Sequence, residues 1–454
     1  MVISLEWLKS TSLPEVCICV PLDCCRWVFL QTMHSGLHQP NIGRIKKYGA
    51  EWKFRLIMLS ETKKIMKYIV FLIIAFTSSV TYARKIKAIT VTNPSSFPRH
   101  EVVTVSLGLL KELGDVNTSF LVREKKSQKV VLSQSIDWNT DNTMDELVFE
   151  VELNAKEKKE YTIEAKNKNL NLEVDPRTTF SRLVPERIDD YAWENDLVAF
   201  RTYGPEAQRL VDENLKGGTL SSGLDCWLKR VNYPVIDKWY RKYVDGGTYH
   251  KDDGEGYDPY HVGASRGCGG IGVWKNDSLY VSKNFVSYKR IASGPVRTVF
   301  ELTYAPWKVD EVVVNETKRI TLDLGSQLYK VEDITSTSGT IPNITIGITL
   351  HEKKGTVSMN AKKGWFSYWE TIDDAPLGTG VVVDPGSILD HADYRTLKKD
   401  LSQIYIMTKP EKKVTYYTGF GWSKAGVITS REAWNDYLDR FAQQLSVPLQ
   451  VSVK

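Results

Sequence analysis

Residues suited to proton transfer are concentrated in the segment 220–274 of this 454-residue chain. The segment contains His250 and His261 together with several tyrosines, carboxylates and repeated glycines. Imidazole and phenol groups are common general bases and acids, and a nearby cation can neutralise an anionic substrate group. The segment therefore predicts an acid–base site in which either histidine works with a neighbouring tyrosine, beside a cation such as Lys229 or Arg266.

Two other interpretations of the same segment stay open at this stage. Its carboxylates at Asp252, Asp253, Glu255 and Asp258 could bind a hard cation, for which Ca²⁺ would need roughly six to eight oxygen ligands. Alternatively, the segment is a solvated acidic loop whose histidines pair locally with carboxylates. The glycines and Pro259 exclude a regular helix, so a long ordered loop is expected.

Aromatic and acidic residues of the larger part of the chain suit a carbohydrate ligand. Flat rings such as that of Trp227 can stack on the apolar faces of sugars. Arg201 and His351 stand at the ends of predicted strands, where site residues are often placed. A glycoside hydrolase would need two carboxylates on opposite sides of a cleft. The candidates are Glu186, Asp189, Asp190, Glu194, Asp225 and Asp258.

The elements that must position these residues are predicted to be almost entirely β-strands. Apolar runs recur about every ten residues beyond residue 84, with turn signals between them. This pattern predicts an all-β chain, with a small β-sandwich over 84–172 and a large antiparallel catalytic domain over 173–454. One short helix is expected near the C-terminus, capped by Ser430, with Trp434, Leu438, Phe441 and Leu445 on one face.

The first 83 residues have the order of a secretory leader. A basic stretch at 63–67 precedes the apolar run 68–76 and the small residue Ala83, which is typical of a signal peptide over 66–83. Residues 1–65 are interpreted as an over-extended reading frame or an unexplained leader. The apolar run is shorter than the roughly 20 residues of a membrane span. The sequence thus predicts a periplasmic or secreted protein without stable membrane insertion.

Removal of this leader would change the charge and the cysteine content. The leader has ten basic and five acidic residues, which accounts for the whole formal charge of +5. The remainder is neutral, so composition gives no reason to expect nucleic acid as a partner. Of the six cysteines, only Cys226 and Cys268 lie beyond the leader. They are expected to form either one disulfide or two buried free thiols.

Several short motifs resemble a family known only as a domain of unknown function. These motifs are LVPER at 183–187, WEND at 193–196, FRTYGP at 200–205, DCWLKR at 225–230 and GEGYD at 254–258. The resemblance covers nearly all of 86–454. Members of that family occur in the polysaccharide-utilisation loci of saccharolytic bacteria, often beside unsaturated glucuronyl hydrolases. Many relatives carry Asp-His-Gly where this chain has Asp252-Asp253-Gly254, which moves the catalytic expectation to the two histidines.

The resemblance implies an exported, carbohydrate-active protein with a β-supersandwich, acting on ulvan-type anionic oligosaccharides as a dehydratase-like lyase. In such an elimination His250 or His261 would be the base and Tyr260 or Tyr257 the proton donor to the leaving group. The substrate-binding residues would be Arg201, Lys229 and Arg266 as an anion clamp, with Asp258, Trp227 and His351. A glycoside hydrolase and a non-catalytic sugar-binding protein are the alternatives.

Overall fold

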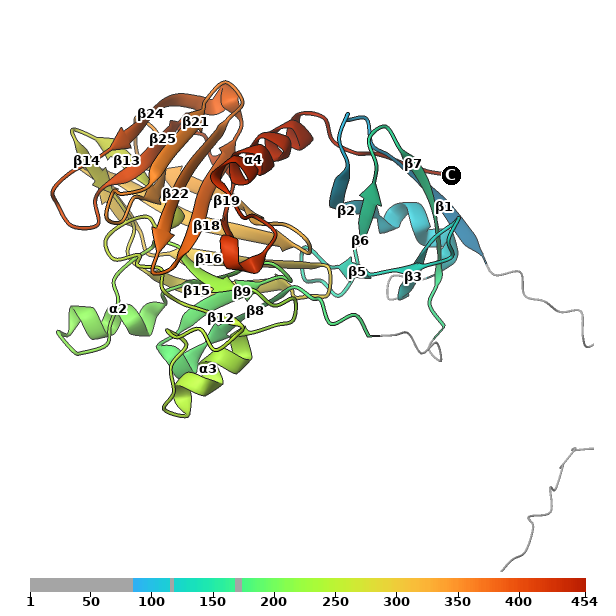
Figure 1. Ribbon diagram of the computed structural model, residues 1–454, viewed down its shortest axis with the longest axis horizontal. Helices are drawn as coiled ribbons and strands as arrows, with labels where there is room; N and C mark the ends of the chain where they lie inside the picture. The colour runs from blue at the N-terminus through green and yellow to red at the C-terminus, as the bar shows by residue number, and fades with distance from the viewer. Residues whose placement is uncertain (1–84, 115–117, 168–173) are drawn as a thin grey trace, which may run out of the picture. The chain divides into compact units, whose positions relative to one another are not determined.

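The computed structural model describes residues 85–114, 118–167 and 174–454, which belong to one compact unit, Ala83–Lys454 (Figure 1). In this part of the chain the named strands form five antiparallel sheets, which confirms the predicted all-β class. The predicted leader and signal peptide lie outside the described residues, and the predicted boundary at 172 falls in a segment that is not described. None of the described helices has the length and apolar character required to cross a membrane.

Two small sheets near the start of the described chain pack face to face as a β-sandwich. Ile89, Val103, Phe149 and Ile163 are among the buried residues of its apolar core, and Leu110 of the 3-10 helix η1 (Leu107–Leu113) joins them. The first sheet has the order β27 (Gln450–Val453), β1 (Ile86–Thr92), β7 (Lys158–Ala165), β3 (Phe120–Glu124) and β4 (Val130–Val131), and the second has the order β2 (Arg99–Ser106), β6 (Glu146–Leu153) and β5 (Ser133–Ile136).

The strand β27 comes from the far end of the sequence yet belongs to this small sandwich. It pairs antiparallel with β1, which places Ile89 opposite Val453. The attachment is reinforced by Arg99, whose Nη1 donates to the backbone oxygen of Val447 at 2.6 Å. The small sandwich is therefore completed by residues that the sequence analysis placed in the second domain.

Two larger sheets enclose the main apolar core. Ile346 and Ile406 from one sheet, and Phe300 and Tyr416 from the other, are among its buried residues. One sheet has the order β14 (Ser278–Tyr280), β13 (Cys268–Lys275), β20 (Ile344–Thr349), β25 (Gln403–Thr408) and β24 (Ile388–Tyr394). The other has the order β15 (Phe285–Ala292), β16 (Arg297–Tyr304), β18 (Val312–Asp323), β19 (Leu328–Thr337), β26 (Lys413–Trp422), β23 (Ala375–Val383), β22 (Trp365–Ile372) and β21 (Thr356–Asn360), with β17 (Trp307–Val309) beside β18.

The predicted C-terminal helix is confirmed as α4 (Arg431–Ser446). Ser430 caps it, because its hydroxyl oxygen accepts a hydrogen bond from the backbone N–H of Ala433 at 3.1 Å. Trp434 and Leu438 are fully buried on one face, as the spacing predicted, whereas Leu445 remains exposed near the end of the helix. The helix packs against β22 and β23 of the nine-stranded sheet.

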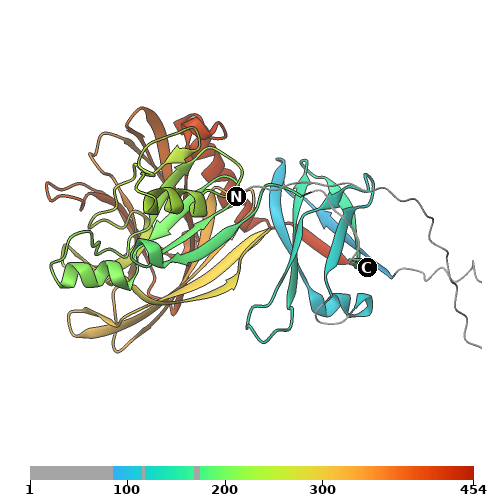
Figure 2. The same ribbon diagram turned by 90° about the horizontal axis from the view of Figure 1, so that it is seen from below.

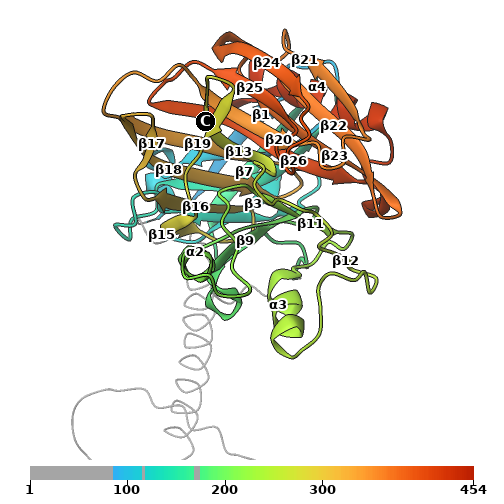
Figure 3. The same ribbon diagram turned by 90° about the vertical axis from the view of Figure 1, so that its left-hand side faces the viewer.

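A fifth sheet carries two short helices that the sequence analysis did not predict. Its order is β12 (Gly256–Tyr257), β11 (Asp225–Lys229), β10 (Ala199–Thr202), β9 (Asp190–Glu194) and β8 (Phe180–Val184). The helices α2 (Pro205–Asp212) and α3 (Ile236–Val244) lie on the same side of the structure, next to this sheet (Figures 2 and 3). Shorter 3-10 turns are η2 (Pro185–Arg187), η3 (Pro385–Ser387) and η4 (Ser423–Ala425).

The two cysteines of the described chain, Cys226 and Cys268, are both buried and free. Burial raises the pKa of the Cys226 thiol, and a hydrogen bond with Cys268 acts in the same direction. Of the two alternatives left open by the sequence, the structure contains the pair of buried thiols.

Candidate functional site

The fifth sheet separates an apolar face from a charged face. Successive strand residues point to opposite faces, so Tyr191, Phe200 and Cys226 enter the main core. Their neighbours Ala192, Ala199 and Trp227 face α3, where Trp239 and Tyr240 cover them. The charged residues of these strands lie on the α3 face and are buried, namely Asp190, Glu194, Arg201, Asp225 and Lys229.

Arg201 is the centre of a buried hydrogen-bonded cluster on this face. Its Nε and Nη2 donate to Asp225 Oδ2 at 2.9 and 2.6 Å, and Nη2 also donates to Asp258 Oδ2 at 2.7 Å. Its Nη1 donates to the hydroxyl oxygen of Tyr249 at 2.9 Å. The guanidinium carbon also lies 5.2 Å from the centre of the Trp227 ring. The side chain is therefore held by two carboxylates, a phenol and an aromatic ring.

A third carboxylate, Asp190, completes the cluster. Tyr240 donates its hydroxyl proton to Asp190 Oδ2 at 3.0 Å. The guanidinium groups of Arg201 and Arg187 lie 3.7 and 3.8 Å from the Asp190 carboxylate. Three buried carboxylates thus share two guanidinium groups, which leaves an excess of one negative charge if all of them are ionised.

This charge imbalance favours a bound proton. Burial raises the pKa of Asp225 to about 7, and the neighbouring Asp258 acts in the same direction, while Arg201 opposes them. Burial likewise raises the pKa of Asp190 and that of Asp258 to about 6. The outer oxygens of Asp225 and Asp190 are buried without a hydrogen-bond partner in the described structure, which adds to the cost of keeping these groups ionised.

We expect a measurable pH dependence of stability from these carboxyl groups. A raised pKa means that the folded protein binds more protons than the unfolded chain, so this stabilisation is full below about pH 4 and is lost as the pH rises through 6 and 7. Denaturant titrations give the free energy of unfolding of each protein. The value for the wild type minus that for Asp225→Asn should fall by about 1 kcal/mol per pH unit in this range. The control is Asp436→Asn, at an exposed carboxylate of α4. If the unfolding free energies of wild type and Asp225→Asn changed with pH in parallel, the raised pKa assigned to Asp225 would be contradicted.

Tyr249 connects the buried cluster to a surface cavity of about 530 Å³. The cavity is also lined by Tyr233 and Trp239 and by the ammonium groups of Lys238, Lys242 and Lys251. Its acidic lining residues are already paired, since Glu255 contacts Lys238 and Asp253 contacts Lys242. Lys251 has no hydrogen-bond or ion-pair partner among the described residues. The cavity thus combines aromatic surface, a phenol held by Arg201 and a lysine available to an anion.

His250 lies directly beside Tyr249, with 4.6 Å between the ring centres. Its Nδ1 is 2.7 Å from the backbone oxygen of Asp258. A carbonyl oxygen can only accept a hydrogen bond, so Nδ1 carries the proton, and Nε2 of the neutral ring keeps its lone pair. The side chain is 56% exposed, so the ring is open to solvent beside Tyr249.

The loop that carries these residues is anchored through Gly256. Gly256 has φ +115°, and it pairs with Lys229 in the sheet. A Cβ atom at this position would lie 1.9 Å from the backbone oxygen of Leu228. Only glycine fits, and its close approach brings Asp258 back onto the face that holds Arg201.

The structure brings together six of the residues predicted from the sequence, namely Arg201, Asp258, Trp227, His250 and the candidate carboxylates Asp190 and Asp225. It also adds Tyr249, which the sequence analysis passed over although it directly precedes His250. The aromatic residues just before Tyr249 could have pointed to it. Trp239 and Tyr240 of α3 cover the sheet, and Tyr249 packs into the same cluster.

Three other predicted residues form a second group. His351 Nδ1 lies 2.6 Å from Glu370 Oε1, and the Tyr260 ring packs edge-on at 4.6 Å. Burial opposes the imidazolium of His351, but the hydrogen bond to Glu370, the Glu370 charge and the hydrogen bond to the His261 backbone oxygen together raise the His351 pKa. His261 offers its backbone oxygen to His351 Nε2, and its own Nε2 lies 3.2 Å from Asp400.

Tyr257 points elsewhere again. Its hydroxyl group donates to Asp373 Oδ2 at 2.9 Å, and its ring packs near that of Trp422. The hydrogen bond engages the proton that a general acid would have to give to a leaving group. Tyr257 and Tyr249 therefore stand in different environments.

The three cations expected to act as an anion clamp do not form one. Lys229 Nζ is buried and donates to Glu194 and to the backbone oxygens of Asn195 and Tyr233, so its three protons are engaged. Arg266 is buried and donates to Ser222. Burial lowers the Arg266 pKa to about 10. Arg201 is held by carboxylates. A cation on a buried strand requires internal partners, which leaves it unavailable to a substrate.

The carboxylates considered for Ca²⁺ are also engaged with cations. Asp252 pairs with Arg230 at 3.0 Å, and Asp258 is bound by Arg201. Asp253 and Glu255 pair with lysines of α3. Among the described residues, no group of three or more His, Cys, Asp or Glu side chains is arranged to hold a metal ion. The loop is therefore held against α3 by ion pairs.

The fold and site define an all-β protein with a buried arginine–carboxylate cluster behind an aromatic and basic cavity. Residues 91–451 match the model of a family described as a domain of unknown function, DUF4861. The chain belongs to this family, which confirms the resemblance found in the motifs. It is 40% identical over 396 residues to uncharacterized protein P7 of Formosa agariphila, covering 86% of this chain and 99% of that protein.

Two solved structures from Enterococcus faecalis show a more distant similarity. One is a protein in glycosyl hydrolase family 38, with 10% sequence identity, a TM-score of 0.44 and coverage of 81% of this chain and 47% of that one. The other is an alpha-mannosidase, with 10% identity, a TM-score of 0.38 and coverage of 81% and 46%. The chain spans about half the length of these two proteins.

Proposed function

We propose that this chain is an exported enzyme that cleaves anionic oligosaccharides by elimination, with Tyr249 and His250 as its proton-transfer groups. The observation that carries the proposal is the hydrogen bond from Arg201 to the Tyr249 hydroxyl oxygen. It fixes the buried phenol, which belongs to the cavity lining, and because the oxygen accepts this bond, the phenolic proton is not used in it. Burial raises the Tyr249 pKa, so the phenol is protonated at neutral pH and suits the role of acid.

The proposed reaction is an elimination on an acidic sugar such as a uronate. His250 Nε2 removes the proton from the carbon next to the carboxylate, and those electrons form a C=C bond. The C–O bond to the leaving oxygen breaks, and the Tyr249 proton passes to that oxygen. Lys251 pairs with the substrate carboxylate, where negative charge accumulates as the C–H bond breaks. The leaving group is a glycosidic oxygen or a hydroxyl group.

A glycoside hydrolase has less support, although three of its six candidate carboxylates, Asp190, Asp225 and Asp258, do converge. Asp225 and Asp258 both accept from the same Arg201 nitrogen, at 2.6 and 2.7 Å, and both are buried. Hydrolases place a sugar between their two carboxylates, about 5–10 Å apart. A buried pair that encloses a guanidinium leaves no room for a sugar, so the geometry supports a structural role for both.

The test is to incubate the protein with acidic and neutral oligosaccharides and to follow product mass and ultraviolet absorbance. Elimination should give a new absorbance from a C=C bond conjugated with the carboxylate, with fragments that sum to the substrate mass when a glycosidic bond breaks, or with loss of water when a hydroxyl group leaves. Products that gain the mass of water without this absorbance would establish the hydrolase. Binding without any product would establish a sugar-binding protein.

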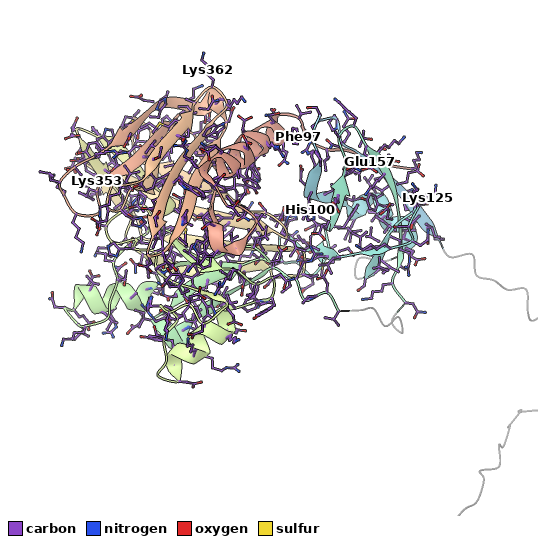
Figure 4. The ribbon with its side chains drawn as sticks, in the orientation of Figure 1. Phe97, His100, Lys125, Glu157, Lys353 and Lys362 are labelled. Atoms are coloured by element: carbon purple, nitrogen blue, oxygen red, sulfur yellow. The ribbon has the colours of Figure 1, made fainter. Side chains whose placement is uncertain are left out.

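Charge reversal at the cavity tests the predicted acidic substrate. Lys251→Glu should raise the KM for an acidic oligosaccharide by about tenfold or more, with a much smaller effect on a neutral one, because one charge-assisted contact becomes repulsive. The matched control is Lys362→Glu, at an exposed lysine in the turn between β21 and β22 (Figure 4). Equal effects of the two substitutions would exclude a specific role for Lys251.

A further inference from the structure

A second cavity, of about 730 Å³, lies outside the residues of the Tyr249 site. It is bounded by strand β2, by the outer face of the nine-stranded sheet and by α4. Its volume is in the range of sites that bind small organic ligands. None of its lining residues takes part in the proposed reaction, so it has to be explained separately.

The floor of this groove is aromatic. Tyr417 of β26 and Phe441 of α4 pack edge to face, with ring centres 5.0 Å apart, and Tyr437 follows at 6.1 Å. The Tyr437 hydroxyl oxygen accepts from the backbone N–H of Gln327 at 3.0 Å, which fixes its ring. These rings are each only partly buried. Rings that are fixed and partly open to solvent provide a surface on which a sugar can stack.

The charged walls of the groove have an excess of positive charge. The acids are already engaged, because Glu101 pairs with Arg99, and Asp323 binds Arg297. Glu146 accepts from the indole N–H of Trp138 at 2.6 Å. The exposed guanidinium of Arg440, on α4 next to Phe441, has no hydrogen-bond or ion-pair partner within the described ranges.

Lys330 and His100 also line the groove, and each has an acidic partner. Lys330 lies 3.3 Å from Glu332, which is buried and also pairs with Lys413. A hydrogen bond to Glu150 raises the His100 pKa, although burial opposes it. An anionic group in the groove would therefore meet one unpaired guanidinium, that of Arg440, with Lys330 and His100 also in the lining.

We propose that this groove is a second, non-catalytic binding site for an acidic oligosaccharide, held by stacking on Tyr417 and Phe441 and by an ion pair with Arg440. The inference goes beyond the proposed function, because it requires no catalysis. It uses the same class of ligand, so a polymer end held here would stay near the enzyme between turnovers.

The experiment is calorimetric titration of the full chain with a hexameric oligouronate, a sulfated hexamer and a neutral hexamer. Tyr249→Phe serves as the background, so that substrate turnover is slow during the titration. We expect two binding sites for an acidic hexamer. Arg440→Glu should weaken one of them at least about tenfold, and Phe441→Ala should weaken the same site. The control is Arg431→Glu on the same helix, whose guanidinium pairs with Glu432 outside the groove.

The outcomes separate this proposal from the proposed function. Binding to an acidic hexamer that is sensitive to Arg440→Glu, without turnover by the wild type, would support the groove and contradict the enzyme. A single site abolished by Lys251→Glu and unaffected by Arg440→Glu would overturn the groove. Equal competition by inorganic sulfate at the concentration of the hexamer would show a simple anion site and would also overturn it.

Discussion

Tyr249→Phe is expected to reduce kcat by about 10²–10⁴-fold, the usual contribution of a general acid. The substitution removes a single oxygen atom and keeps the ring, which packs 4.9 Å from Trp227 and 5.4 Å from Tyr243. Arg201 would lose one acceptor, at a cost of about 1–3 kcal/mol of stability, so the fold should be retained. Steady-state rates on an acidic oligosaccharide, with unfolding curves for the same samples, provide the measurement.

Tyr243→Phe is the matched control for this substitution. Tyr243 is on α3, contacts the Tyr249 ring and has no hydrogen-bond partner for its hydroxyl group in the described part of the chain. Its loss should change the rate less than about threefold. Tyr257→Phe and Tyr260→Phe compare the two donors expected from the sequence. If either reduces kcat more than Tyr249→Phe does, the acid has been assigned to the wrong tyrosine.

Arg201→Met should be the most destabilising single change in the site. Methionine approximates the length of the side chain but leaves Asp225 and Asp258 buried without their guanidinium, and leaves Asp190 with Arg187 alone. Removing one member of a buried ionic network costs about 3–5 kcal/mol of unfolding free energy. The measurement is denaturant unfolding near pH 7.5, where the carboxylates would otherwise ionise. A loss below about 1 kcal/mol would contradict the cluster as described.

Two further variants keep this prediction testable even if Arg201→Met does not fold. Adding Asp225→Asn removes one buried charge and should recover part of the loss, which a double-mutant cycle would show as coupling. Arg182→Met is the control, because Arg182 pairs with Glu186 and with the exposed carboxylate of Asp237 near the surface. Such a pair is worth about 1 kcal/mol or less. If Arg182→Met lost as much unfolding free energy as Arg201→Met, the buried cluster would not contribute more to stability than a surface ion pair.

Local sequence patterns were sufficient for the fold class and for the last helix. The alternating strands and the Ser430 cap depend on neighbours within a few residues, and both are present in the structure. The helix α3 was missed because it has only nine residues and follows directly on a strand-rich segment. The addition of β27 to the small sandwich was missed for a different reason, since nothing near Gln450 specifies a partner as distant as β1.

The site shows the same limit. The sequence identified Arg201, Asp258 and His250 as candidates, because their residue types can do chemistry wherever they lie. It could not tell that Lys229 is saturated by a buried glutamate while Lys251 is free at the surface, because both are simply lysines near aromatic residues. Burial and pairing decide which cation can meet a substrate, and these arise from contacts between distant segments.

The pairing of β27 with β1 sets an order of events during biosynthesis. Strand β1 emerges from the ribosome early, but the partner for one of its edges is made only after the large sheets between them. Until then this edge presents unpaired backbone groups, which are prone to pair with other chains. Protection of the β1 edge until β27 is made should therefore limit such pairing, and a tag fused after Lys454 would be placed beside the strand that completes the sandwich.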